Sequence, residues 1–134
     1  DYRLLAGPER VQDEARAAVG AAGRMAGLLS RNTELPVPEL AAAYTERARH
    51  EAHAGGAPRI LIGNGEPRIV VTGDGRGGRA THLALLMARE IAGLPGVSFL
   101  ACGTDDRDGS SSASGAAVDG TTWARAVAAG LDPA

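Results

Sequence analysis

Two kinds of hydrophobic pattern alternate along the chain. Apolar residues at helical spacing predict helices over 8–22, 38–53 and 79–92, and Thr121 can cap a fourth that runs to about residue 129. Short apolar runs predict strands over 2–6, 25–30, 59–62, 68–72, 97–102 and 116–118. This alternation predicts an α/β fold, a layered sheet with flanking helices.

The first strand, helix and second strand form a unit that implies parallel pairing, because a helix returns the chain to the same end of the sheet. The stretch Gly63-Asn64-Gly65 separates two other strands, and Asn-Gly is a strong hairpin signal. The sheet is therefore expected to be mixed, with an antiparallel hairpin over 59–72. Gly55-Gly56-Ala57-Pro58 is the clearest linker and predicts a partial α/β segment over 1–57 and a second domain over 58–134.

Composition narrows the possible functions. The 134 residues are 44% hydrophobic with a net charge of −2, which permits a packed core and argues against a partner held by phosphate contacts, such as nucleic acid. The sequence has no apolar run that could span a membrane and no signal peptide. The single cysteine, Cys102, excludes an internal disulfide and fits a reducing, cytoplasmic compartment. The chain begins at Asp1 rather than Met, which predicts that it is a piece of a longer protein.

The most distinctive stretch is the loop between the predicted strand 68–72 and the helix that starts near Arg79. It has four glycines in the six positions from Gly73 to Gly78, with Arg76 inside it and Arg79 at its exit. Glycines let the backbone approach a ligand, and a helix start presents unpaired N–H groups. Together with two guanidinium groups, these features predict an anion site.

Neither of two common nucleotide-binding motifs fits this loop in full. Gly73, Gly75 and Gly78 match G-x-G-x-x-G, but the nearest candidate for the acidic partner, Asp105, lies 27 residues after Gly78 rather than about 20. The loop has no lysine of the kind that a P-loop requires. A dinucleotide site is thus the weaker alternative, and a P-loop is excluded.

A second group of polar residues follows the predicted strand 97–102. Asp105, Asp106 and Asp108 lie in one turn beside Thr104. Carboxylates at a strand end could hold Mg²⁺ next to a phosphate. They could equally cap local N–H groups, and the sequence leaves both interpretations open.

Other residues that could carry chemistry have simpler interpretations. His50 and His53 lie three residues apart on one predicted helix and could bind a metal ion, but the sequence marks out no third ligand. A helix face exposed to solvent is therefore favoured over a metal site. His82 lies in the first turn after the glycine loop, where a surface position is favoured over ligand contact. Cys102 is expected to be small and buried, and Trp123 to pack in the core.

From Leu61 onward the chain resembles the MOFRL domain of the glycerate 2-kinase family, some members of which are labelled hydroxypyruvate reductases. The matching pieces stand in the family's order and spacing: Gly73-Asp74-Gly75-Arg76-Gly77-Gly78-Arg79, Leu83-Ala84-Leu85, Gly93-Leu94-Pro95-Gly96-Val97, Gly103-Thr104-Asp105, Asp108-Gly109, Gly115-Ala116 and Val118-Asp119. Residues 1–57 resemble the segment that precedes this domain, more weakly.

The resemblance implies transfer of phosphate from ATP to D-glycerate with Mg²⁺, in a cleft between this domain and a large N-terminal domain. It implies catalytic roles for Arg76, Arg79 and Asp105, and a metal site at Asp105 and Asp108. It further implies substrate or phosphate binding at Gly73, Gly75, Gly77, Gly78, Thr104 and Glu66.

The chain departs from the family pattern around this site. The family's Asn-Gln-Glu after the arginine loop is Ala80-Thr81-His82, its glycine after the Thr-Asp pair is Asp106, and an acid further on is Ser112. Three functions therefore stay open: part of a glycerate 2-kinase, a non-catalytic anion- or nucleotide-binding or assembly module, and an NAD(P)-dependent hydroxypyruvate reductase. We expect the chain alone to be inactive without the missing domain or partner chain, and an exposed sheet edge favours a homodimer.

Overall fold

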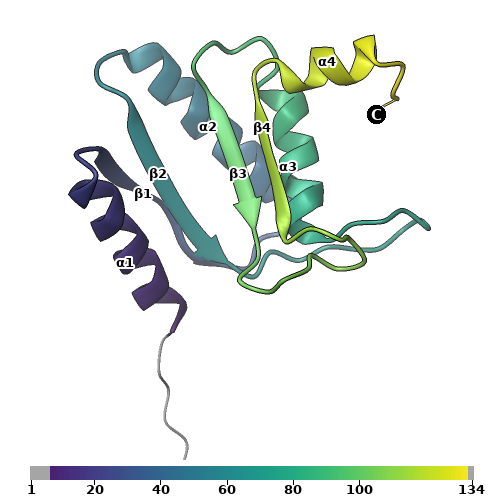
Figure 1. Cartoon of the computed structure of the whole chain (residues 1–134), viewed down its shortest axis with the longest axis horizontal. Coiled ribbons are helices and arrows are strands. Elements are labelled where there is room, and N and C mark those ends of the chain that lie inside the picture. The colour runs from purple at the N-terminus through teal and green to yellow at the C-terminus, as the bar shows by residue number, and fades with distance from the viewer. Residues whose placement is uncertain (1–6, 133–134) are drawn as a thin grey trace, which may run out of the picture. The chain divides into compact units, whose positions relative to one another are not determined.

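The computed structural model describes residues 7–132, so the predicted strand over 2–6 lies outside it. The elements are α1 (Pro8–Ala21), β1 (Met25–Thr33), α2 (Val37–Ala54), β2 (Arg59–Gly65), α3 (Arg79–Glu90), β3 (Ser98–Cys102), β4 (Gly115–Asp119) and α4 (Thr122–Ala128) (Figure 1). The predicted α/β class is confirmed. The helices start and end within about two residues of the predicted positions, because their signals are local.

Two compact units make up the described chain. The first unit contains residues 7–35 and 55–67, and the second contains residues 36–54 and 68–132. The chain passes from the second unit to the first directly before the linker Gly55–Pro58, and it also changes unit after residues 35 and 67. The first unit takes residues from both sides of the linker because β1 and β2 pair with each other. Within residues 7–132, no helix is both long and apolar enough to cross a membrane.

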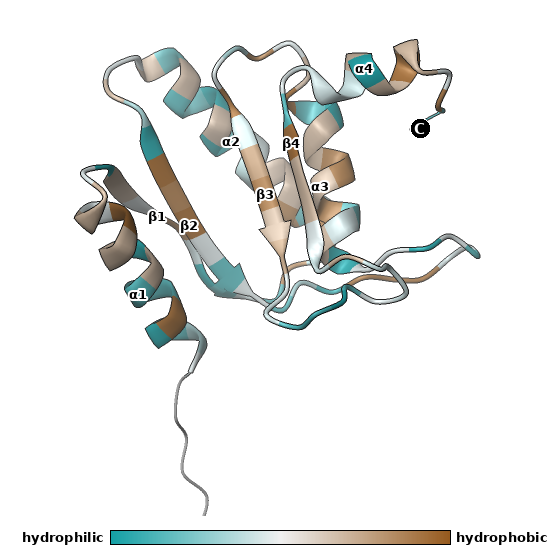
Figure 2. Ribbon diagram, viewed as in Figure 1, coloured by the Kyte–Doolittle hydropathy of each residue, from teal (hydrophilic) through white to brown (hydrophobic). Residues whose placement is uncertain are grey.

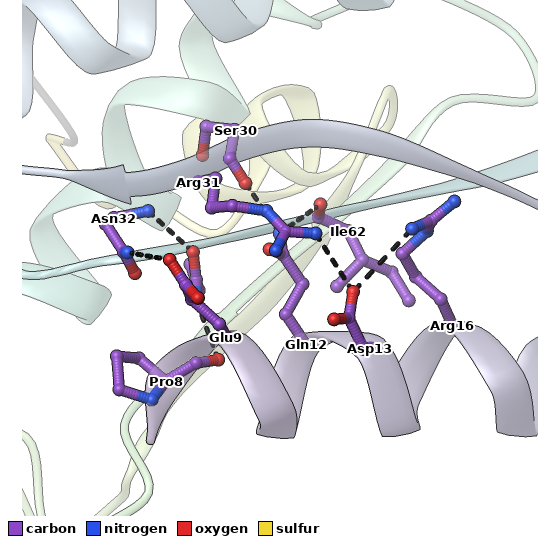
Figure 3. A network of polar contacts seen from close by, with 10 residues as sticks. Pro8, Glu9, Gln12, Asp13, Arg16, Ser30, Arg31, Asn32 and Ile62 are labelled. Carbon is purple, nitrogen blue, oxygen red and sulfur yellow. Dashed lines mark hydrogen bonds and ion pairs between the residues drawn. The ribbon is translucent and has the colours of Figure 1, made fainter.

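The first unit consists of α1 and the parallel pair β1–β2, in which Met25 lies opposite Arg59. The middle of β2 is apolar and its two ends are polar (Figure 2). Gln12 of α1 points at both strands, and its Nε2 donates to the carbonyl oxygens of Ser30 at 2.5 Å and Ile62 at 2.9 Å (Figure 3). One helix side chain therefore joins both strands of the sheet.

The hairpin predicted over 59–72 is wrong. The Asn64 position that predicted a turn lies inside β2, where the Asn64 side chain donates to the Pro8 carbonyl and accepts from the Asn32 amide, both at 2.7 Å. These tertiary contacts outweigh the local turn preference of Asn-Gly. Of the predicted strand 68–72, only Arg68 forms a ladder contact, with Pro36, whereas Val70 is 83% exposed.

The second unit has its core between α2, α3 and the antiparallel pair β3–β4. Its buried apolar side chains come from both helices and from the residue that directly follows α3: Val37, Leu40, Ala41, Tyr44, Leu83, Ala84, Met87, Ala88 and Ile91. The Tyr44 ring tilts against that of Phe99 on β3, with 6.1 Å between the ring centroids. Parallel and antiparallel pairing are thus both present as predicted, but in two separate two-stranded sheets, and the antiparallel strands are β3 and β4 rather than the predicted pair.

Three expectations for the end of the chain need correction. Cys102 is exposed rather than buried, because β3 turns only alternate side chains toward α3. Trp123 is only half-buried and is not a core residue. The Thr121 side chain does not cap α4; instead, Asp119 Oδ1 accepts from the Thr121 amide at 2.8 Å.

Candidate functional site

The glycine- and arginine-rich loop, residues 73–79, runs into the first turn of α3 and lies beside the loop that joins β3 to β4 (Figure 1). Residues Gly73 to Arg76 are exposed, and Gly77 and Gly78 are half-buried. The two loops lie at the same end of the second unit. The residues of the glycine loop and those of the acidic turn therefore meet there.

Backbone and side-chain hydrogen bonds join the two loops at Gly77. The Gly77 amide donates to Ser110 Oγ at 3.0 Å, and the Ser110 amide donates back to the Gly77 carbonyl at 3.0 Å. Gly109 has a φ of +58°, and a Cβ there would lie 2.3 Å from the Gly77 carbonyl oxygen. The close approach of the loops therefore requires glycine at 109.

Asp108 makes the second connection, to the start of α3. Its side chain is 7% exposed, and its carboxylate accepts from the amide of Ala80 at 3.1 Å and from the amide and hydroxyl of Thr81 at 2.7 and 2.8 Å. A Cβ at Gly78 would lie 2.5 Å from Asp108 Oδ1, so glycine there makes room for the carboxylate. Asp108 thus caps α3 from a distant part of the sequence.

The surroundings of Asp108 favour its ionised form. Burial by itself would raise the pKa of the carboxyl group, but the hydrogen bonds from Thr81 and Ala80 and the positive charge of Arg79 outweigh burial and lower the pKa below its ordinary value. The positive end of the α3 dipole acts in the same direction. Asp108 is therefore a charged group at neutral pH.

The other predicted site residues lie on the surface. Arg76, Arg79, Thr104 and Asp105 are exposed on the two loops of the second unit. Glu66 belongs to the first unit, where its amide donates to the Thr33 carbonyl at 2.9 Å. The structure thus brings the glycine loop together with the acidic turn at Gly77, Ala80 and Thr81.

The three histidines occupy exposed positions, as expected. His82 lies on the first turn of α3, and His50 and His53 lie on α2. The His53 ring is hydrogen-bonded to the Arg49 carbonyl at 2.6 Å. Within residues 7–132, no three or more His, Cys, Asp or Glu side chains come together as metal ligands.

Sequence reasoning missed the roles of Thr81 and Ser110. Thr81 Oγ1 accepts from the Gly78 amide at 2.8 Å, a contact that closes the first turn of α3. Thr81 stands three residues after the N-cap, a position whose side chain often bonds back to the N-cap amide. The sequence could therefore have predicted this contact. Ser110 had no such signal, because its partner Gly77 lies 33 residues away.

The fold and the site define an α/β protein whose arginine-bearing glycine loop is held by an acidic turn. The chain belongs to the MOFRL family, whose family model matches residues 59–134. The resemblance to the glycerate 2-kinase family is confirmed by relatives that align with nearly the whole chain.

Three of these relatives illustrate the similarity. The chain is 36% identical to a glycerate kinase of Macaca fascicularis, over 99% of this chain and 34% of that protein. The crystal structure of a Thermotoga maritima glycerate kinase superposes with a TM-score of 0.91 at 30% identity, over 99% of this chain and 33% of that one. A putative hydroxypyruvate reductase of Agrobacterium vitis is 31% identical, over 99% of this chain and 32% of that protein. The chain spans about a third of the length of these relatives.

Proposed function

We propose that this chain forms part of the active site of a glycerate 2-kinase, in which residues 73–79 bind a phosphate group or the glycerate carboxylate. The observation that carries the proposal is the exposed arginine-bearing loop, which is fixed at its base by Asp108 and Ser110. The family match and the names of the relatives support the same reaction.

The arginines are the loop's main means of binding an anion. A guanidinium group binds carboxylate or phosphate oxygens in a bidentate manner, so Arg76 and Arg79 can fix both the charge and the direction of a bound group. The amides of Ala80 and Thr81 already serve Asp108. An incoming anion would thus be bound by the arginine side chains and the glycine amides of the loop tip, rather than by these two helix amides.

The proposed cofactors are ATP and Mg²⁺, and the acidic turn fits them in part. Mg²⁺ favours one or two carboxylates together with phosphate oxygens, and exposed Asp105 could supply such a ligand. Asp108 does not fit this role, because both of its oxygens accept hydrogen bonds from α3. When bound, ATP supplies the phosphoryl group, while this chain's part is to orient and neutralise charge.

The proposal includes a cleft whose other wall is provided by a further domain or partner chain. The relatives are about three times as long as this chain, which supports such an addition. We expect the 134 residues alone to show no glycerate turnover.

Exposed Cys102 is consistent with a reducing, cytoplasmic compartment.

A phosphotransfer assay on the full polypeptide that contains this chain tests the proposal. With ATP, Mg²⁺ and D-glycerate, we expect Arg76→Ala to reduce kcat/KM about 100-fold, since a charged hydrogen bond in a desolvated site contributes several kcal/mol. Arg125→Ala is the control, because it removes the same charge on α4. Equal activity of the two variants would remove Arg76 from the site.

A second candidate function is a non-catalytic anion- or nucleotide-binding module. It is favoured by the occupation of the α3 amides by Asp108 and by the changed residues Ala80, Thr81 and His82. Separate titrations with ATP and with glycerate, each with and without Mg²⁺, distinguish the two functions. A kinase site binds both molecules and depends on Mg²⁺, whereas a module binds one of them. Binding of NADPH would instead favour the reductase named among the relatives.

A further inference from the structure

We propose that Asp108 is a positioning residue, which fixes the conformation in which the glycine- and arginine-rich loop presents its arginines to an anion. The inference rests on the proposed function, because it concerns the same loop. It goes further by assigning to a buried carboxylate a role in shaping the anion site, without any contact with the substrate.

The argument begins with the two-point attachment of the carboxylate. Asp108 Oδ1 accepts from the Ala80 amide at 3.1 Å, and Oδ2 accepts from the Thr81 amide at 2.7 Å. Two contacts to consecutive amides fix the carboxylate plane relative to the first turn of α3. Since Arg79 is the residue directly before these amides, the direction of its backbone follows from the same contacts.

A second attachment holds the loop on the other side of Arg79. Gly77 exchanges two hydrogen bonds with Ser110, and Ser110 lies only two residues after Asp108. The segment from Gly77 to Thr81 is therefore held at both ends by one short stretch of the β3–β4 loop. The exposed tip that carries Arg76 continues directly from this segment.

The charge of Asp108 is essential to the attachment. A carboxylate only accepts hydrogen bonds, and here it faces two amide donors and a hydroxyl donor. An asparagine of the same size would place an NH₂ group against an N–H group, so one contact would become repulsive. The helix dipole adds a further preference for negative charge at this point.

The first test measures hydrogen–deuterium exchange of the full polypeptide that contains this chain. In Asp108→Asn, we expect the amides of Ala80 and Thr81 to exchange about tenfold faster, because their acceptors are weakened. Asp106→Asn is the matched control, since Asp106 is an exposed carboxylate of the same turn. Exchange at the wild-type rate in Asp108→Asn would overturn the proposal.

A milder pair of variants covers the case in which Asp108→Asn does not fold. Thr81→Val keeps the amide and the shape of the side chain but removes the hydroxyl that bonds to Asp108 and to Gly78. We expect faster exchange in this variant and recovery of the wild-type rate in Thr81→Ser, which restores the hydroxyl. If the two variants exchange alike, the hydroxyl plays no part in holding the loop and the proposal fails.

The second test asks whether the attachment shapes the anion site. Inorganic phosphate is titrated into wild type, Asp108→Asn and Asp106→Asn, and we expect affinity to fall about tenfold only in Asp108→Asn, equivalent to the loss of one well-placed contact. Unchanged phosphate affinity together with faster exchange would overturn the positioning role. Equal phosphate binding by wild type and Arg76→Ala would contradict the proposed function, while the exchange experiment would still decide whether Asp108 holds the loop.

Discussion

Gln12 and Asp108 are two buried polar side chains that do similar structural work in different units. Gln12 is 2% exposed and donates to carbonyls of two strands, whereas Asp108 is 7% exposed and accepts from amides at a helix start. Asp108 satisfies both of its oxygens, but Gln12 Oε1 has no hydrogen-bond partner among residues 7–132. A neutral amide is adequate for joining strands, while the dipole at a helix start favours a negative charge.

The largest effect is expected from Asp108→Ala. The change leaves the amides of Ala80 and Thr81 without their acceptor in a half-buried site, so we expect a loss of about 2–3 kcal/mol in the free energy of unfolding. Urea unfolding of the variant and wild type measures this loss. A loss below that of the Gln12 variant would show that the charge adds nothing to this contact.

Gln12→Met is expected to have the next largest effect. Methionine keeps the length of the side chain but cannot donate to the Ser30 and Ile62 carbonyls, and the unpaired Oε1 disappears at the same time. Because removal of the unsatisfied acceptor offsets part of the loss, we expect a cost of about 1 kcal/mol. Gln12→Glu is the contrasting variant, since its carboxylate would face two carbonyls. A smaller cost for Glu than for Met would contradict the assigned donor role.

Acid should weaken the Asp108 contact and leave the Gln12 contact unchanged. Because the folded state lowers the pKa of Asp108 below its ordinary value of 3.8, the contribution of Asp108 is complete above that value and is lost as pH falls through the folded pKa. We expect stability to decline below about pH 4, with a shallower decline in Asp108→Asn.

Asp119 is the control for this pH dependence. Its pKa is also lowered, mainly by the hydroxyl and amide of Thr121, and it lies outside both buried contacts. Unfolding of wild type, Asp108→Asn and Asp119→Asn is compared from pH 3 to pH 6. Identical pH profiles of wild type and Asp108→Asn would mean that folding does not lower the pKa of Asp108.

The smallest effect is expected at the surface beside Gln12. Arg31 pairs with Asp13 at 2.9 Å, but both side chains are exposed (Figure 3). We expect Arg31→Ala to cost less than about 0.5 kcal/mol, since solvent and salt screen such pairs. Thermal unfolding measures the change, and a cost as large as that of Gln12→Met would assign the stability of this unit to its ion pairs.

Local signals in the sequence predicted the helices but not the contacts that hold the site. Pro8 and Gly23 mark the two ends of α1, so its limits could be read directly. The Asn64-Gly65 signal misled, because Asn64 bonds to Pro8 and Asn32, far away in the sequence. A Cβ at Gly65 would lie 2.2 Å from the Thr33 carbonyl oxygen, so this glycine serves strand packing rather than a turn.

The candidate site was predicted in its parts but not in its connections. The glycine loop and the acidic turn were both recognised, since unusual residue types gather in each. The pairing of Asp108 with Thr81 spans 27 residues and depends on the tertiary fold, so no spacing rule could supply it. Whether an acid binds metal or caps a helix is decided by which donors the fold brings to it.

The glycines of the two joined loops are subject to two different kinds of evolutionary constraint. At Gly78 and Gly109, an added methyl group would collide with Asp108 and with Gly77, so the fold itself forbids replacement. At Gly73 and Gly75, an added Cβ would meet nothing within 4 Å. Substitutions at these two positions can therefore accumulate without harm to folding. We expect related proteins to keep glycine at these two positions only where a bound molecule occupies the space.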